Sequence, residues 1–390
     1  MPDCVLSSQN RFYVEIEADY GEVPAIVAGD RIAAVQLGIR QRTEVPERRD
    51  KTGSRTFTGV LPGSRKTTDF NLVTYLIENS TPSNPPPIGP MVQVGLGAPP
   101  LVFSGTTAGV GSTTTAIEFS SSHGLVVGQA FGFGGEIRFV ETVNSATSVS
   151  VNAPFSAAPG SGASLTAAVS YFPADELPSA SVFDYWDPST VVSRVLNGAS
   201  VDRTQIRING DFHELEFIGE AQDVIDSVTF LAGQGGLGTF PVEPAVTGSI
   251  GAPVTGNLGQ AWLGSPSTKF FTVTSALIEV DNDIDLRNRE FGTTTPQCIA
   301  AGQRRVTADI ELFEVDDEAT RGLYAAARNE SPIGVMFQLG EATGQMLGVY
   351  MPNVVPQVPE FDDGERILQW RFSDSRAQGS VNDEIVVAFG

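Results

Sequence analysis

The sequence predicts a mainly β protein with two tandem β-sandwich or barrel modules and a short flanking helix, plus an inserted small all-β domain. Three observations predict this class. Segments in which apolar and polar residues alternate recur along the chain, and this alternation is typical of half-buried strands. One longer pattern occurs once in each half of the chain. The 390 residues also include 41 Gly and 25 Pro, enough to supply many turns.

The clearest alternating segments lie at residues 12–17, 34–40, 207–218 and 277–281. One helix is predicted. Asp316 and Asp317 can cap the stretch EATRGLYAAAR, in which Leu323 and Ala327 share a face. Arg328 falls near the C-terminal end of this stretch, where the helix dipole favours a cation. The first half shows no obvious equivalent of this helix.

The repeated pattern begins at a glycine in each half. Gly63 opens GSRKTTDFNL and Gly302 opens GQRRVTADIEL, and both continue through two basic residues to Thr-x-Asp-apolar-x-Leu. In each copy the last two apolar residues should point to the same side of a strand. An alternating strand and then a charged polar segment, 41–56 or 282–295, precede each copy. A strand, a glycine turn and another strand follow it, so we predict a duplicated module.

Composition shifts define the expected domains. We expect residues 1–84 and 179–240 to form the first module, 85–178 the insert, 241–260 a linker and 261–390 the second module. The insert opens with TPSNPPPIGP, a proline cluster that can continue neither a central strand nor a helix. Its low charge favours an exposed decoration.

The net charge of −22 indicates a surface that repels DNA and anionic membranes. Two cysteines are too few for a disulfide scaffold. No apolar run approaches the roughly 20 residues needed to span a bilayer, and the first residues lack the pattern of a secretory signal. We therefore expect a soluble protein made in the cytoplasm, with no membrane span.

No motif predicts catalysis, a cofactor or a metal site. The glycines of 233–238 match G-x-G-x-x-G, but prolines follow where a nucleotide-binding helix should begin, which favours a turn. The acidic residues of 281–285 have the first spacing of a calcium loop, yet Leu286 stands where that loop needs glycine. His123 and His213, the only histidines, lack ligand spacing and are expected at a surface or interface. We expect a protein that is not an enzyme.

Three stretches resemble the tail tube (major tail) proteins of long-tailed bacteriophages: VEIEADYGEVPA, LNGASVDRTQIRINGDFHELEFIGEA, and CIAAGQRRVTADIELFEVDDEATRGLYAAA with IGVMFQLGEATGQMLGVYMPNVV. The resemblance covers the N-terminus and both modules but not 85–178. It implies a virion protein whose sheets join those of neighbouring copies into a β-barrel around a channel. Two tube modules per chain imply trimeric rings with pseudo-sixfold symmetry. The implied partners are further copies and other tail proteins, with DNA passing through unbound.

This resemblance turns charged residues of the polar segments and the basic pairs into candidate contacts. The candidate inter-ring or inter-subunit residues are Arg48, Arg49, Lys51, Arg55, Arg65, Lys66, Asp283, Asp285, Arg287, Arg289, Arg304 and Arg305. The basic pairs of the repeated pattern are Arg65-Lys66 and Arg304-Arg305. They are either solvated strand residues or partners for acids on a neighbouring subunit. The polar segments are candidates for contacts with the next ring, and the channel is expected to be acidic.

Two other classes stay open. A baseplate or tail-tip ring protein could use the same fold, and it would form single closed rings instead of long polymers. A carbohydrate-binding or adhesive β protein would use the insert for recognition and bind glycans as a dispersed monomer.

Overall fold

The computed structural model describes residues 5–44, 51, 53–56, 64–187, 191–246, 250–287, 289–364 and 366–390. The fold is mainly β, as predicted. The first half contains β1 (Asn10–Ile16), β2 (Arg31–Ile32), β3 (Ala34–Thr43), β4 (Lys66–Tyr75), β13 (Ala180–Trp186), β14 (Arg194–Ile208), β15 (Glu214–Ala221) and β16 (Asp223–Asp226). The segment between β4 and β13 contains β5 (Leu101–Phe103), β6 (Thr106–Thr107), β7 (Ala116–Glu118), β8 (Ala130–Phe133), β9 (Glu136–Ser145), β10 (Ser148–Val151), β11 (Ser164–Leu165) and β12 (Ala168–Tyr171).

The second half contains β17 (Gly259–Gly264), β18 (Thr268–Phe270), β19 (Val273–Asp281), β20 (Asp285–Leu286), β21 (Ile299–Ala300), β22 (Arg305–Phe313), β23 (Ile333–Leu339), β24 (Leu347–Val355), β25 (Glu360–Asp362), β26 (Gln369–Ala377) and β27 (Val386–Phe389). The helices are α1 (Gly89–Leu96) and α2 (Glu318–Arg328), with short 3-10 turns η1 (Ser7–Gln9), η2 (Ala28–Asp30) and η3 (Gln234–Gly236).

The strand pairings of the first half recur in the second. β1 pairs with β2 and β13, β13 with β14, β14 with β15 and β16, and β15 with β4, which pairs with β3. Likewise β17 pairs with β18 and β23, β23 with β24, β24 with β26 and β27, and β26 with β22, which pairs with β19. Each strand of the first set therefore has a counterpart in the second, in the same chain order.

The two helices occupy matching places in this order. α2 follows β22, and its N-cap Asp317 accepts a hydrogen bond from the Thr320 amide, as the sequence predicts. α1 follows β4, packs against β14 and β1, and buries Met91 and Val94 in the main core. The expectation that the first half lacks such a helix is therefore wrong. The proline cluster precedes α1 and places Pro90 in its first turn, where proline is tolerated.

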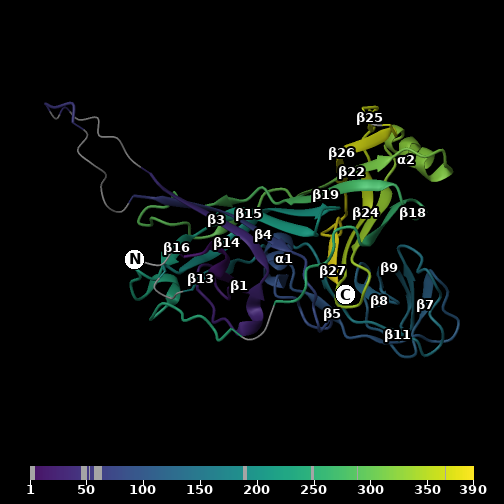
Figure 1. Ribbon diagram of the computed structural model, residues 1–390, viewed down its shortest axis with the longest axis horizontal. Helices are drawn as coiled ribbons and strands as arrows, with labels where there is room; N and C mark the ends of the chain where they lie inside the picture. Colours follow the sequence, from purple (N-terminus) through teal and green to yellow (C-terminus); the bar gives the residue numbers. More distant parts are fainter. Residues whose placement is uncertain are drawn as a thin grey trace.

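A single sheet runs through both halves because β14 pairs with β19. The register runs from Arg203 opposite Asp281 to Ile208 opposite Ala276. The resulting order β3-β4-β15-β14-β19-β22-β26-β25, called here the shared sheet, crosses the upper part of the molecule (Figure 1). The segment predicted as one strand at 207–218 contains the turn between β14 and β15.

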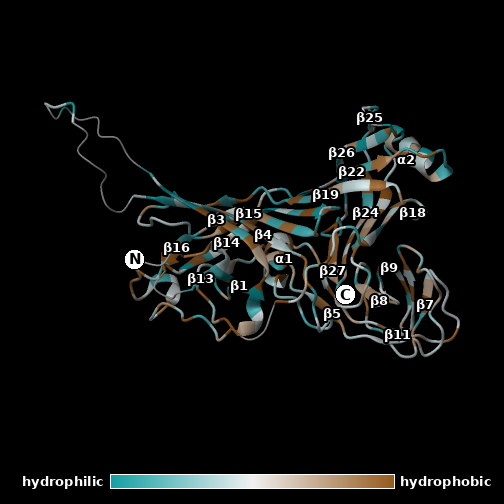
Figure 2. Ribbon diagram, in the orientation of Figure 1, coloured by the Kyte–Doolittle hydropathy of each residue, from teal (hydrophilic) through white to brown (hydrophobic). Residues whose placement is uncertain are grey.

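One face of the shared sheet lies on a continuous core. The alternation along β4 buries Phe70 and Leu72, and that along β22 buries Ile310 and Leu312, as predicted for the repeated pattern. These side chains belong to one core cluster that extends across both halves. The opposite face is polar, visible as hydrophilic strands in Figure 2.

The insert is anchored to the second half. β12 pairs with β27 on one side and with β5 on the other, so part of the segment predicted as decoration extends a sheet of the second half. Beyond it, Phe139 of β9 stacks on Tyr350 with ring centroids 5.3 Å apart. Trp262 and Met336 lie in the same apolar cluster. Removal of the segment would therefore expose core side chains.

A buried ion pair joins the insert to the second half. Arg138, with no exposed side-chain surface, donates to Glu136 at 3.0 Å. It also donates to Gln338 of β23 and Gln260 of β17, at 3.2 and 3.1 Å. Its guanidinium lies over the ring of Trp262, 5.0 Å from the centroid. This network fixes the insert in one orientation, because each member contacts both units.

Candidate assembly interface

Both ends of the shared sheet are open among the described strands. β3 pairs only with β4, and β25 pairs only with β26. Every residue of β25 is exposed, as are Arg40 to Thr43 at the end of β3. An open edge presents unpaired backbone N–H and C=O groups that can hydrogen-bond to a strand of another chain.

β25 is the counterpart of the second half of β14. In the first half, Thr204 of β14 lies opposite Phe217 of β15, and Phe217 lies opposite Leu72. In the second half, Phe361 of β25 lies opposite Trp370, which lies opposite Leu312. The free side of β25 therefore corresponds to the side of β14 that pairs with β19.

The charges of the joined and open edges are arranged differently. Where the halves join, β14 presents Arg203 and Arg207, and β19 presents Glu279 and Asp281. Gln205 also donates a 2.6 Å hydrogen bond to Glu279 across the junction. At the open edges the counterparts carry the opposite signs. The end of β25 is acidic, with Asp362 and Asp363, whereas the end of β3 contains Arg40 and Arg42. Apart from Glu360 and Glu44, which hold the places of Arg203 and Asp281, each open edge therefore matches the other edge and repels its own kind.

Ion pairs bridge neighbouring strands on the polar face of the shared sheet. The pairs are Arg42–Asp69, Arg207–Glu216, Arg305–Asp281 and Arg371–Glu311. This face therefore carries both signs of charge, although the chain as a whole is strongly acidic.

Glu220 is an exception on this face, because acids surround it. It lies opposite Asp69 in the register of β15 and β4, near Asp202 and Asp285. Burial raises the pKa of Glu220, and the neighbouring carboxylates raise it further, while the charge of Arg42 opposes the shift in part. Ionised Glu220 thus opposes folding at neutral pH.

We expect Glu220→Gln to raise the melting temperature at pH 7.5 but not at pH 3.5. A carboxyl group with a raised pKa in the folded state costs stability once pH exceeds its unfolded pKa of about 4.3. Below that pH both states are protonated, so the gain should vanish. Glu214→Gln is the control, because Glu214 lies opposite Tyr75 and Arg207. An equal gain at both pH values would contradict the electrostatic explanation.

The polar segment 282–304, here called the second arm, lies against the first half. Asn282 donates to the carbonyls of Gly95 and Val201, at 2.9 and 3.0 Å. Further along, the carbonyl of Thr294 accepts from the Lys66 amide, and the carbonyl of Pro296 accepts from the Gln222 side chain. The second arm therefore passes beside the middle of β14 and crosses the ends of β4 and β15.

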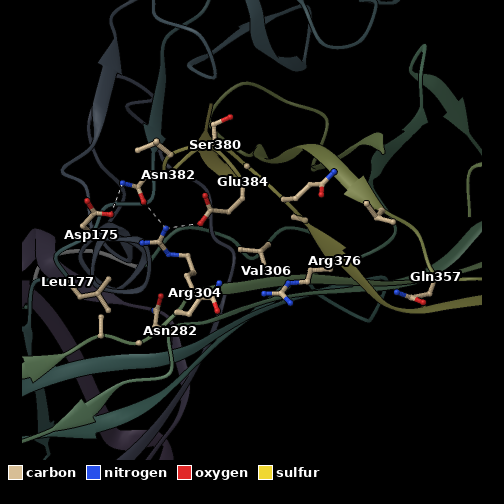
Figure 3. Close-up of a pocket in the computed structure, with 18 residues that line it drawn as sticks. Asp175, Leu177, Asn282, Arg304, Val306, Gln357, Arg376, Ser380, Asn382 and Glu384 are labelled. Carbon is tan, nitrogen blue, oxygen red and sulfur yellow. Dashed lines mark hydrogen bonds and ion pairs between the residues drawn. The ribbon is translucent and has the colours of Figure 1, made fainter. Parts of the chain in front are cut away.

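The matching strand ends of the second half border an open polar groove of about 930 Å³ (Figure 3). Gln357 follows β24, Arg376 and Gln378 lie at the end of β26, and Arg304 precedes β22. Arg304 donates to Glu384 at 2.8 Å. Charged and amide side chains line the groove together with apolar ones such as Val306 and Val355.

The candidate contact residues are partly brought together, all within one chain. Lys66 lies 3.6 Å from Asp223, Arg304 pairs with Glu384, and Arg305 pairs with Asp281. Arg65 donates to the carbonyl of Arg289 at 3.0 Å, and Arg287 pairs with Glu290. Asp283, Asp285, Lys51 and Arg55 are exposed, while Arg48 and Arg49 lie outside the described residues. A role between subunits stays a prediction for the whole set.

The rejected motifs can be placed as well. Residues 234–236 form a 3-10 turn with no α-helix after it, as expected. His213 is buried, not superficial, and its Nε2 lies 3.1 Å from the carbonyl oxygen of Leu258. Burial lowers its pKa. Within the described part of the chain, no group of three or more His, Cys, Asp or Glu residues is placed to hold a metal ion.

The sequence matches no protein-family model, and no curated protein matches it significantly. Among the helices of the described ranges, none is long and apolar enough to cross a bilayer.

Proposed function

We propose that this chain is a structural subunit of a phage tail tube, which assembles edge to edge into rings that stack around a DNA-conducting channel. The observation that carries the proposal is the junction of β14 with β19. One chain already joins two equivalent units side by side through a sheet, and it leaves the equivalent edges, β25 and β3, open at the two ends.

The proposed junction between copies, β25 with β3, would repeat the β14–β19 junction within the chain. The register of the β14–β19 junction, transferred to the open edges, sets Asp362 of one copy opposite Arg42 of the next. These residues correspond to Gln205 and Glu279, which are hydrogen-bonded inside the chain. Closure around a ring removes both open edges of the shared sheet, which supports an oligomer over an exposed monomer. Six units from three chains give the proposed pseudo-sixfold ring.

The polar face of the shared sheet is the proposed channel lining. Its cross-strand ion pairs engage Arg207, Arg305 and Arg371 with carboxylates, so these cations are not free to hold phosphates and DNA could slide past them. The lining would be mixed in charge, unlike the uniformly acidic channel expected from composition.

A charge exchange tests the junction. Arg40→Glu with Arg42→Glu should abolish assembly, and so should Asp362→Arg with Asp363→Arg, because each places like charges along the junction. Combining all four substitutions should restore it. Light scattering and negative-stain microscopy would report ring and tube formation.

The control is Arg321→Glu, on the exposed surface of α2, which should leave assembly unchanged. Assembly by either charge-reversed pair alone would contradict this junction. Wild-type protein that stays monomeric at high concentration would contradict the proposed function. Single rings without stacking would instead favour the baseplate or tail-tip alternative.

A further inference from the structure

We infer that the polar groove of the second half is a docking site for residues 44–65 of a second copy of this chain. This inference rests on the proposed edge-to-edge assembly and names the segment that completes it. It places this segment, here called the first arm, against the neighbour in the same ring instead of against the next ring.

The second arm provides the template. It leaves β19 at the junction with β14, passes beside the middle of β14 and crosses the ends of β15 and β4 before it returns to β22. Leu286 and Pro296 of this arm are buried, and the Pro296 carbonyl contacts Gln222 of the first half. The junction and the arm thus form one continuous contact between the two units.

The groove lies over the corresponding strand ends of the second half, and the two ends of the second arm together with Asp175 and Leu177 form part of its wall. β15 ends in Ala221-Gln222, and β26 ends in Ala377-Gln378. The backbone N–H of Gln222 donates to the backbone carbonyl of Asn197, and the backbone N–H of Gln378 donates to the backbone carbonyl of Asn353. The two glutamines therefore hold matching places. Gln222 binds an arm carbonyl, whereas Gln378 is exposed on the wall of the groove.

The first arm is the segment that can reach this groove. It follows β3 as the second arm follows β19, and it returns to β4 as the second arm returns to β22. If β3 of one copy pairs with β25 of the next, the first arm leaves the junction beside β24 and β26 of that neighbour. The groove then receives main-chain carbonyls at Gln378, as the first half does at Gln222.

The chemistry of the groove suits such an occupant. On one wall of the groove, Arg304 donates a hydrogen bond to Asn382, and the Asn382 side chain donates one to Asp175 (Figure 3). These side chains are therefore already fixed within the chain. Arg376 is exposed near the end of β26 and lines the groove. The first arm carries three acidic and five basic residues, and the groove likewise offers both signs of charge, with Arg376 and Arg304 beside Asp175 and Glu384.

Photo-cross-linking tests the inference. p-Benzoylphenylalanine would replace Gln378 in full-length protein, and 15N-labelled and unlabelled copies would be mixed before assembly and irradiation. Mass spectrometry should find position 378 of one isotopic form joined to residues 44–65 of the other. The same probe in place of Gln222 is the control and should reach residues 294–297 of its own chain.

The outcomes separate the two proposals. Rings that form while position 378 reaches other surfaces, or nothing, would overturn the docking site and leave the edge junction standing. Cross-links that join residues 44–65 to a copy in a stacked ring would also overturn the docking site and leave the edge junction standing. Failure of the probe-free protein to form rings would overturn both.

Discussion

Replacing Arg138 with methionine is expected to lower the free energy of unfolding by about 3–5 kcal/mol at pH 7, because it leaves the buried Glu136 carboxylate without its cation. Burial lowers the pKa of Arg138 to about 10, although Glu136 opposes this shift, so the pair is fully charged at neutral pH. The lost hydrogen bonds to Gln338 and Gln260 would also loosen the insert from the second half. Urea unfolding followed by tryptophan fluorescence would measure the change.

The effect should depend on pH in a defined direction. Burial alone would raise the pKa of Glu136, but hydrogen bonds from Ser156 and Gln260 and the charge of Arg138 together lower it. A carboxyl group of this kind stabilises the fold above its unfolded pKa, about 4.3, and the contribution is lost as pH falls through the folded pKa. The difference between wild type and Arg138→Met should therefore shrink in acid.

Two variants check the cause. Arg321→Met removes a partner from the exposed pair with Asp316, and it should cost less than about 1 kcal/mol. Adding Glu136→Gln to Arg138→Met removes the stranded charge and should recover part of the loss. Arg138→Met that unfolds at the wild-type urea concentration would show that the network does not hold the insert.

Much of the fold could be predicted from local sequence patterns. The alternation in the repeated pattern that opens at Gly63 and Gly302 predicted which side chains of β4 and β22 are buried. The capping residues Asp316 and Asp317 predicted the start of α2. These features depend on neighbours along the chain, so the sequence displays them directly.

The missed features depend on contacts between distant segments. α1 is short and mostly buried, so it has no polar face to give a helical period, and the preceding prolines disguised its start. Arg138 lies in β9, far along the chain from Gln260 and Gln338, its partners. The correspondence of β25 to β14 was hidden because the second half divides the equivalent chain into two strands. Only strand registers reveal the open edges.

The extent of the insert leads to the last prediction, in which two deletions should behave differently. Deleting residues 85–178 should abolish folding, because it removes α1 with Met91 and Val94 from the main core and β12 from the edge of β27. Replacing only residues 104–167 with Asn-Gly should leave a folded chain. Phe103 and Ala168 lie directly opposite each other in β5 and β12, so a two-residue turn can join them as a hairpin.

The shorter deletion should still weaken the second half, because it uncovers Trp262, Met336 and Tyr350, each worth about 1.5–3 kcal/mol of burial. Circular dichroism melting and limited proteolysis would report stability, while light scattering reports assembly. Because β3 and β25 lie outside the deleted segment, the shorter variant should still form rings at low temperature. If it folds but stays monomeric, the insert takes part in the junction between copies; if the longer deletion folds as well, α1 is not needed for the core of the first half.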